Sequence, residues 1–282
     1  MKKIKALIGL LRPELLFAAG ICVIIGEIIP LGKLPSLTEI SLGFLWGVFL
    51  SSPAMILNDL FDIKVDRVNA PKRALPSGLI SVSTVIIFTI ITTLIGLAVS
   101  FFIGKPAVIL YLIFWIIGFL YNWKLKELGL LGNLSVSSSV AITIILGAIV
   151  VGDPWNKVVG IFTLIVFLLN LGEEIAADAM DIEGDKQRNV KSIAILYGRR
   201  NSLRISAFLF IIAIILSFLP YLWGLFGIAY FMIISLMDIL ILFFTIKLIK
   251  SKCKEIGRIL IRRIYLSGLL GMVLIILSMI II

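Results

Sequence analysis

Two short acidic segments carry most of the side chains in this sequence that could do chemistry. Each contains three aspartates separated by two and then three residues: Asp59, Asp62 and Asp66 in the first, and Asp178, Asp181 and Asp185 in the second. Spacings of three and four stack side chains on one side of a helix. We therefore expect a first acidic ladder of Asn58, Asp62 and Asp66, with Asp59 beside it, and a second acidic ladder of Asp178, Asp181 and Asp185.

Carboxylates stacked beside apolar segments are stable only with cations, because like charges repel one another and hydration is poor there. Mg²⁺ typically takes one or two carboxylates and completes its shell with water and substrate phosphates. The two ladders therefore predict two Mg²⁺ ions that grip a diphosphate between them. The expected metal ligands are Asn58, Asp59, Asp62, Asp66, Asp178, Asp181 and Asp185.

A solvated acidic face paired with lysine and arginine is the alternative interpretation of each ladder. For a single ladder this alternative would be the simpler one. The matched spacing of the two segments argues against it, and so does the scarcity of acids, because the 282 residues include only 16 Asp and Glu. We therefore favour metal binding by both ladders.

Basic residues close to the ladders could complete a diphosphate-binding site. Arginine can hold phosphate oxygens with two parallel hydrogen bonds, whereas lysine acts as a point charge. The candidates follow the first ladder, the Tyr121-Asn122 pair and the second ladder: Lys72, Arg73, Lys124, Lys126, Arg188 and Lys191. Taken singly, each of them is more simply explained as a marker of membrane topology.

Membrane helices must position these residues. Hydrophobic residues make up 61% of the chain, which exceeds what a soluble core requires, so the bilayer is the solvent for most of the surface. Nine apolar segments span it or nearly so. They are approximately Leu15–Leu31, Ser41–Leu57, Leu79–Ile103, Ala107–Trp123, Leu130–Val151, Val158–Ala177, Ile205–Leu222, Gly224–Ile246 and Ile264–Ile282.

The distribution of basic residues supports this nine-helix arrangement. All but three of the 26 Lys and Arg residues lie in the N-terminal segment or the even-numbered loops, the exceptions being Lys33, Lys105 and Lys157. The positive-inside rule then predicts a multi-pass cell-membrane protein with its N-terminus and both ladders on the cytoplasmic side and its C-terminus outside. The basic segment Met1–Pro13 is expected to form an interfacial helix rather than a removed signal peptide.

The repeated spacing also predicts internal symmetry. Four helices separate the ladders, so helices 1–4 are expected to be echoed by helices 5–8, with helix 9 added. We expect one all-α transmembrane domain over residues 1–282 that encloses a central chamber accessible to lipid.

Composition excludes several classes of site. The chain has no histidine, which excludes His-ligated haem or zinc, a histidine base and a Ser-His-Asp triad. Cys22 and Cys253 are far apart in the sequence, form no zinc or redox pattern and are interpreted as packing residues. The net charge of +10 is interpreted as topology and contact with anionic lipid, and no nucleic-acid partner is expected.

The two ladders resemble the signature motifs of the UbiA family of intramembrane prenyltransferases. The second reads Asp178-x-x-Asp181-x-Glu183-Gly184-Asp185. The first reads Asn58-Asp59-x-x-Asp62-x-x-x-Asp66, followed by Asn69-x-Pro71-x-Arg73-x-x-Pro76-Ser77-Gly78. The resemblance covers essentially the whole chain, because the nine helices and both motifs occur in the family's order.

This resemblance implies an Mg²⁺-dependent prenyltransferase with a UbiA-like helix bundle. It implies one ion on Asn58, Asp62 and Asp66 and another on the second ladder. Arg73, Lys126 and Lys191 are expected to neutralise the diphosphate of an isoprenyl donor. Tyr121 is expected to line the apolar pocket that shields an allylic carbocation, or to donate a hydrogen bond to the diphosphate.

Within the family, both motifs are most similar to those of the archaeal ether-lipid branch. That similarity implies transfer of a geranylgeranyl group from its diphosphate to the hydroxyl of geranylgeranylglyceryl phosphate, a lipid phosphate acceptor. Arg12, in Leu11-Arg12-Pro13, is the expected acceptor contact. Without histidine, a carboxylate or the departing diphosphate must take the hydroxyl proton. The sequence leaves the oligomeric state open.

Two other functions stay open at this point. An aromatic acceptor, as in quinone or chlorophyll-type pathways, would change the acceptor pocket and leave the diphosphate motifs as they are. A cation-coupled transporter also combines intramembrane acids with internal repeats. Glu27 and Asp238, which lie inside predicted spans, fit that second function.

Overall fold

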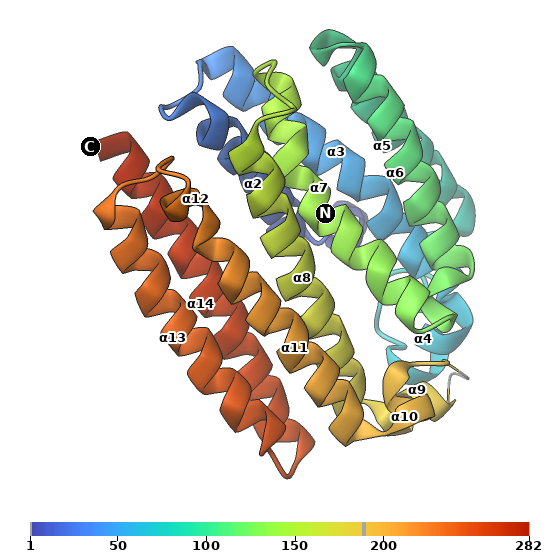
Figure 1. Cartoon of the computed structure of the whole chain (residues 1–282). Coiled ribbons are helices and arrows are strands. Elements are labelled where there is room, and N and C mark those ends of the chain that lie inside the picture. Colours follow the sequence, from blue (N-terminus) through green and yellow to red (C-terminus); the bar gives the residue numbers. More distant parts are fainter. Residues whose placement is uncertain (1, 188–189, 282) are drawn as a thin grey trace. The chain divides into compact units, whose positions relative to one another are not determined.

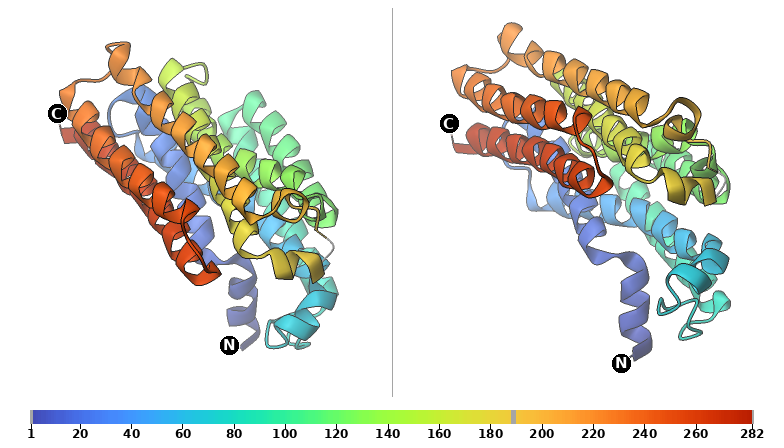
Figure 2. Two further views of the ribbon diagram at one scale, coloured as in Figure 1. Left: turned by 60° about the horizontal axis from the view of Figure 1, so that its bottom comes forward. Right: turned by 90° about the horizontal axis from the view of Figure 1, so that it is seen from below.

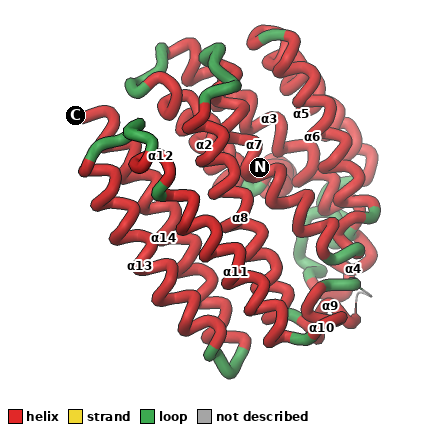
Figure 3. The backbone as a smooth tube through the Cα atoms, in the orientation of Figure 1, coloured by secondary structure: helices red, strands yellow, loops and turns green. Residues whose placement is uncertain are grey.

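The computed structural model describes residues 2–187 and 190–281, and these residues form helices and loops without strands (Figures 1 and 3). Long apolar runs favour helices here, because helices satisfy every backbone hydrogen bond within one segment. The helices are α1 (Lys2–Leu11), α2 (Pro13–Leu31), α3 (Leu37–Phe61), α4 (Ile63–Asn69), α5 (Val82–Ile103), α6 (Lys105–Trp123), η1 (Leu125–Glu127), α7 (Leu130–Val150), α8 (Lys157–Met180), α9 (Ile182–Gln187), α10 (Ile193–Tyr197), α11 (Arg199–Ser217), α12 (Leu219–Leu222), α13 (Ile228–Ile249) and α14 (Lys254–Ile281).

Nine stretches of the described chain are long and apolar enough to cross a membrane. They are α2, α3, α5, α6, α7, α8, α11 together with α12, α13 and α14. The predicted all-α class and the predicted number of spans are both confirmed. Large apolar side chains are exposed along these helices, for example Ile87 and Leu94 on α5 and Met232 and Leu236 on α13, as expected where lipid is the solvent.

Two predicted helix boundaries were wrong. The last helix begins at Lys254 rather than at Ile264, because its first turns carry basic residues that resemble a loop in the sequence. The predicted span Ile205–Leu222 begins earlier, at Arg199, and is interrupted after Ser217. Pro220 lies in the short helix α12 that follows the interruption, since proline fits the first turn of a helix and not its interior.

The chain divides into two compact units. Unit 1 comprises Met1–Glu27, Pro35–Lys124 and Leu146–Asp153. Unit 2 comprises Ile28–Leu34, Leu125–Ile145 and Pro154–Ile282. The first ladder belongs to unit 1 and the second to unit 2. The internal repeat of four helices stays a prediction.

In unit 1, helix α3 packs against α5 and α6. Helix α2 approaches α3 closely at Gly47, where a Cβ atom would stand 2.8 Å from the Ala19 carbonyl oxygen. Helix α1 turns away from the line of α2, as both views in Figure 2 show. Leu10 anchors α1, because its side chain is 1% exposed and packs in one cluster with Ile56, Leu75, Ile80 and Val85.

In unit 2, helix α8 packs along α11, and α13 packs along α14. Gly172 permits the first of these contacts, because the Phe210 ring lies where a Cβ atom would project. Ser206 Oγ donates a hydrogen bond of 2.7 Å to the Gly172 carbonyl oxygen across the same contact. This packing holds the C-terminal end of α8, which carries the second ladder.

Candidate active site

The first ladder spans a one-residue break between helices. Helix α3 ends at Phe61 and α4 begins at Ile63, with Asp62 between them. The backbone N–H of Asp62 donates to the Asn58 carbonyl over 3.0 Å, and that of Asp66 donates to the Asp62 carbonyl over 2.8 Å. Helical hydrogen bonding therefore continues through the break and preserves the four-residue spacing.

The second ladder has the same local construction. Helix α8 ends at Met180 and α9 begins at Ile182, with Asp181 between them. The Asp181 N–H donates to the Asp178 carbonyl over 3.1 Å, and the Asp185 N–H donates to the Asp181 carbonyl over 2.9 Å. The shared spacing in the sequence thus corresponds to a shared arrangement of a long helix, one aspartate and a short helix.

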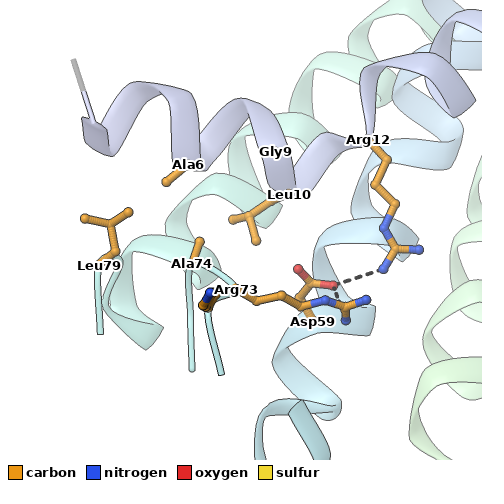
Figure 4. Close-up of a pocket in the computed structure, with 9 residues that line it drawn as sticks. Ala6, Gly9, Leu10, Arg12, Asp59, Arg73, Ala74 and Leu79 are labelled. Carbon is orange, nitrogen blue, oxygen red and sulfur yellow. Dashed lines mark hydrogen bonds and ion pairs between the residues drawn. The ribbon is translucent and has the colours of Figure 1, made fainter. Parts of the chain in front are cut away.

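Two arginines neutralise the carboxylates of the first ladder. Arg73 Nη1 lies 2.7 Å from Asp66 Oδ2 and 3.8 Å from Asp59 Oδ1. Arg12 Nη2 donates to the same Asp59 Oδ1 over 3.1 Å, so the two guanidinium groups approach Asp59 together (Figure 4). The hydrogen bond to Asp66 raises the pKa of Arg73 above its ordinary value, which keeps this guanidinium charged at every physiological pH.

Asn122, at the end of α6, orients the Asn58 amide. Asn58 Nδ2 donates to Asn122 Oδ1 over 3.0 Å, and Asn122 Nδ2 donates to the carbonyl oxygens of Ala54 and Gly118 over 2.9 and 3.0 Å. The Asn58 Oδ1 atom is left to face Arg12, whose Nη2 lies 3.2 Å away. Sequence reasoning missed Asn122; a buried asparagine at the end of an otherwise apolar helix is the signal that could have revealed it.

A pocket of about 420 Å³ opens beside Asp59 in unit 1. Its charged lining consists of Arg12, Lys72, Arg73 and Asp59, and its apolar lining comes from α1 and from the loop after α4 (Figure 4). Three cations face one carboxylate, so the pocket has a net positive charge. It can therefore hold an anionic group next to apolar walls.

The second ladder has two partners that sequence reasoning also missed. Asn133 of α7 donates its Nδ2 to Asp178 Oδ2 over 2.8 Å. Arg258 of α14 lies 3.7 Å from Asp181 Oδ1, measured from Nη2. The basic start of α14 thus contacts the second ladder. The sequence pattern assigns this segment to a loop and therefore does not predict the contact. Asp185 is buried, with a relative exposure of 7%.

Lys126 and Lys191 come from adjoining backbone segments of unit 2. The Lys191 N–H donates to the carbonyl of Glu127, the residue after Lys126, over 3.1 Å. Gly129 follows with a φ of 58°, and a Cβ atom there would overlap the Lys191 carbonyl. Only glycine fits this close approach, so Gly129 lets the two lysine-bearing segments meet.

The remaining predicted site residues fall in three places. Tyr121 and Lys124 lie at the end of α6 in unit 1, on either side of Asn122 and Trp123. Lys72 lines the pocket beside Asp59. Arg188 lies outside the described residues.

The donor set suits a hard cation such as Mg²⁺, because it consists of carboxylate oxygens and the outward-facing amide oxygen of Asn58. Within the described part of the chain, no three acidic side chains converge closely enough to hold an ion. In unit 1, Arg12 contacts the carboxylate of Asp59 and Arg73 contacts that of Asp66. The metal assignments of both ladders stay predictions.

The model of the UbiA prenyltransferase family matches residues 19–279. The chain belongs to this family. Its similarity to curated archaeal proteins extends over most of the chain. The digeranylgeranylglyceryl phosphate synthase of Pyrococcus abyssi is 34% identical over 249 residues, which cover 88% of each chain. The protein of the same name from Methanocaldococcus jannaschii is 34% identical over 255 residues, 90% of this chain and 89% of that one.

Solved structures of UbiA proteins have the same fold. A structure of digeranylgeranylglyceryl phosphate synthase is 32% identical to this UbiA prenyltransferase and superimposes over 100% of both chains with a TM-score of 0.88. A UbiA homologue from Archaeoglobus fulgidus, solved with GPP and Mg²⁺, is 20% identical and has a TM-score of 0.73 over 98% of this chain and 100% of that one. The predicted UbiA-like bundle is confirmed.

Membership of the UbiA family makes this chain a membrane prenyltransferase and replaces the transporter hypothesis. Asp238, one of the two acids behind that hypothesis, has a packing role: Ser217 Oγ donates to its Oδ2 over 2.6 Å. Tyr230 in turn donates to the Ser217 carbonyl over 2.6 Å, where α11 is interrupted. This network satisfies polar groups that the helix break exposes.

Proposed function

We propose that this UbiA prenyltransferase acts as a digeranylgeranylglyceryl phosphate synthase. It transfers the geranylgeranyl group of geranylgeranyl diphosphate to the hydroxyl of geranylgeranylglyceryl phosphate. Relatives that carry this name are 34% identical over most of the chain, which supports the assignment.

The basic pocket of unit 1 is the observation that carries the proposal. An acceptor with a phosphate needs cations beside an apolar surface, and Arg12, Lys72 and Arg73 provide the cations. Ala6, Leu10 and Leu79 provide the apolar part of the lining. An aromatic acceptor carries no phosphate, and even an aromatic acid would bring only a single negative charge to three cations around one carboxylate. The pocket therefore favours a lipid phosphate.

The ladders and the lysines outside them act on the donor. Each ladder would hold one Mg²⁺ ion. The ligands would be Asn58, Asp59, Asp62 and Asp66 for the ion in unit 1, and Asp178, Asp181 and Asp185 for the ion in unit 2. When bound, Mg²⁺ supplies positive charge that stabilises the diphosphate as a leaving group. Arg73, Lys126 and Lys191 add fixed cations for the same oxygens, with further substrate contacts from Lys124 and Arg188.

The reaction exchanges one carbon–oxygen bond for another. The bond between the allylic carbon of the donor and the diphosphate breaks, and the acceptor hydroxyl oxygen bonds to that carbon. The hydroxyl proton passes to the departing diphosphate or to a carboxylate, because the chain has no histidine. Apolar walls and Tyr121 shield the allylic cation from water. The site faces the cytoplasm, where the basic residues gather.

The test is a competition assay on the purified chain in lipid nanodiscs, with labelled geranylgeranyl diphosphate. Geranylgeranylglyceryl phosphate, its dephosphorylated alcohol and an aromatic acid are offered as acceptors with Mg²⁺ or with EDTA. We expect Mg²⁺-dependent product from the phosphate-bearing acceptor only. Preferred prenylation of the aromatic acid, or equal use of the alcohol, overturns the proposal.

Two variants connect this activity to the ladders. Asp62→Ala and Asp181→Ala, made separately, are each expected to lower the rate by about 10²-fold or more, as removal of a group that stabilises transition-state charge typically does. Glu255→Ala is the matched control, since Glu255 is an exposed carboxylate in the first turn of α14. Full activity in both ladder variants contradicts the metal assignment.

A further inference from the structure

Arg12 has a backbone conformation unlike that of any other described residue. Its φ of 47° makes it the one non-glycine residue with positive φ among the residues that the structure describes. It lies between α1 and α2, directly before Pro13. Side chains rarely adopt this left-handed region, so the strain indicates that the position of Arg12 is functionally constrained.

The Arg12 side chain occupies the space where the first ladder would receive a metal ion. A single nitrogen, Nη2, donates to Asn58 Oδ1 over 3.2 Å and to Asp59 Oδ1 over 3.1 Å. These oxygens are among the ligands proposed above. A divalent cation bound to both of them would need the place of this nitrogen and would repel its positive charge. Metal binding and this contact therefore exclude each other.

We propose that Arg12 is an internal counter-ion of the first ladder that exchanges partners when the metal binds. Without metal, its guanidinium group holds Asn58 and Asp59. With metal, the guanidinium group leaves these oxygens and binds the phosphate of the lipid acceptor. The inference rests on the proposed function and adds a rule to it: metal loading and acceptor-phosphate binding support each other.

The pocket gives the displaced guanidinium group an anion site within reach. Arg12 already lines this pocket together with Lys72 and Arg73, so a change of side-chain torsion angles is sufficient (Figure 4). The helix α1 itself can stay in place, because Leu10 is anchored in the core of unit 1. Movement is thus confined to one side chain.

Arg73 is not the residue that exchanges. Its Nη1 lies 2.7 Å from Asp66 Oδ2 and has no contact with the Asn58 amide, whose only described guanidinium contact is Arg12. After Arg12 leaves, Asp59 keeps Arg73 at 3.8 Å. The ladder therefore retains one permanent arginine and one exchangeable arginine.

The exchange predicts two measurable couplings. Removing the Arg12 charge abolishes the competition, so the ladder binds a divalent cation more tightly in the absence of phosphate. In the unsubstituted chain, a phosphate monoester draws Arg12 away and raises the affinity for the cation, and thermodynamic linkage makes this effect reciprocal. Without Arg12 this second effect is lost.

The experiment measures Mn²⁺ binding to the full-length chain in nanodiscs by electron paramagnetic resonance, with and without glycerol phosphate. Arg12→Gly removes the charge and accepts the positive φ, and Arg12→Gln removes the charge while keeping an amide donor, so one variant can replace the other if either folds poorly. We expect both to bind Mn²⁺ about five-fold more tightly or better without glycerol phosphate, within the usual range of coupling energies. Neither should respond to glycerol phosphate as the unsubstituted chain does.

Lys64→Ala is the matched control, because Lys64 is an exposed cation on α4. A general loss of positive charge would tighten Mn²⁺ binding in Lys64→Ala as much as in Arg12→Gly, and that result overturns the exchange. Unchanged affinity in both Arg12 variants overturns it as well. If the unsubstituted chain binds no Mn²⁺ while prenyl transfer still proceeds, both the proposed metal site and the exchange are contradicted. Asp62→Ala tests the metal site separately from the exchange. If Asp62→Ala loses Mn²⁺ binding while both Arg12 variants bind Mn²⁺ as the unsubstituted chain does, the metal site is supported and the exchange is overturned.

Discussion

Asn58 and Asn122 share a hydrogen bond of 3.0 Å, from Asn58 Nδ2 to Asn122 Oδ1, that determines which side of the Asn58 amide faces the first ladder. Asn122 is 2% exposed and is itself held by backbone carbonyls of α3 and α6. The relationship joins residues 64 positions apart and makes an oxygen, rather than an NH₂ group, available to a cation.

Asn122→Ala is therefore expected to weaken cation binding. Without Asn122 the Asn58 amide can rotate and present its NH₂ group, and loss of such an orienting partner typically costs about 10- to 100-fold in metal affinity. Mn²⁺ titration of the purified variant measures the change. Asn201→Ala is the control, because exposed Asn201 donates its side-chain amide to the Tyr197 carbonyl in the last turn of α10, away from both ladders in the sequence. Equal affinities in the two variants contradict an orienting role for Asn122.

Arg73→Ala is expected to lower prenyl transfer by roughly 10- to 150-fold, the effect of losing a charged hydrogen bond of about 1.5–3 kcal/mol. Arg73→Lys keeps the positive charge but loses the paired hydrogen bonds of a guanidinium group. Its rate of prenyl transfer should therefore lie between that of the unsubstituted chain and that of Arg73→Ala. Because the hydrogen bond to Asp66 raises the pKa of Arg73 above its ordinary value, the guanidinium group stays charged, and its contribution is fully present, at any pH below that ordinary value. Rates of the unsubstituted chain measured from pH 6 to 9 should therefore show no titration of Arg73. Arg200→Ala, an exposed arginine of α11, is the control.

Gly129→Ala should impair the enzyme more than an equally strained glycine elsewhere. A left-handed φ costs an alanine about 1–2 kcal/mol, and the added Cβ atom would also displace the Lys191 carbonyl. Gly152→Ala is the matched variant, since Gly152 has a φ of 80° but open space around it. Both should lose thermal stability, measured by tryptophan fluorescence. Only Gly129→Ala should also lose prenyl transfer, and equal rates in the two variants would show that the contact with Lys191 is dispensable.

Gly147→Ala should destabilise unit 1, because a Cβ atom there overlaps the backbone of α2 at Val23 and Glu27. Overpacking of this kind costs about 1–3 kcal/mol. Gly160→Ala is the control: no atom lies within 4 Å of its added Cβ, and alanine is the better helix former by about 1 kcal/mol. We expect the thermal midpoint to fall for Gly147→Ala and to stay or rise for Gly160→Ala. The opposite order would contradict the close packing of α2 and α7.

The helices and both ladders were predictable because they depend on local patterns. Apolar runs of sufficient length give the nine spans, and the three- and four-residue spacings give ladders that persist through the breaks at Asp62 and Asp181. The partners of the ladders were not predictable in this way. Asn133 lies 45 positions from Asp178, and no periodicity in the sequence relates them.

The missed contact of Arg258 has a different cause. A run of basic residues before an apolar segment fits a cytoplasmic loop as well as the first turns of a helix. Because the hydropathy of such a run is low, the sequence pattern predicts a loop. The structure continues α14 back to Lys254, which places Arg258 within 3.7 Å of Asp181. The strained φ of Arg12 was equally hidden, because left-handed backbone has no signature in a sequence without glycine at that position.

The separation of the ladders into two units also sets an order for biogenesis. The contacts of the first ladder with Arg12, Arg73 and Asn122 all involve residues that precede residue 125, so they can form once α6 has entered the bilayer. Arg258 lies near the start of α14, so Asp181 can meet it only after that part of α14 has been synthesised. A chain still attached to the ribosome can therefore have a neutralised first ladder while the second still lacks Arg258, so the two ladders acquire their arginine partners at different stages of synthesis.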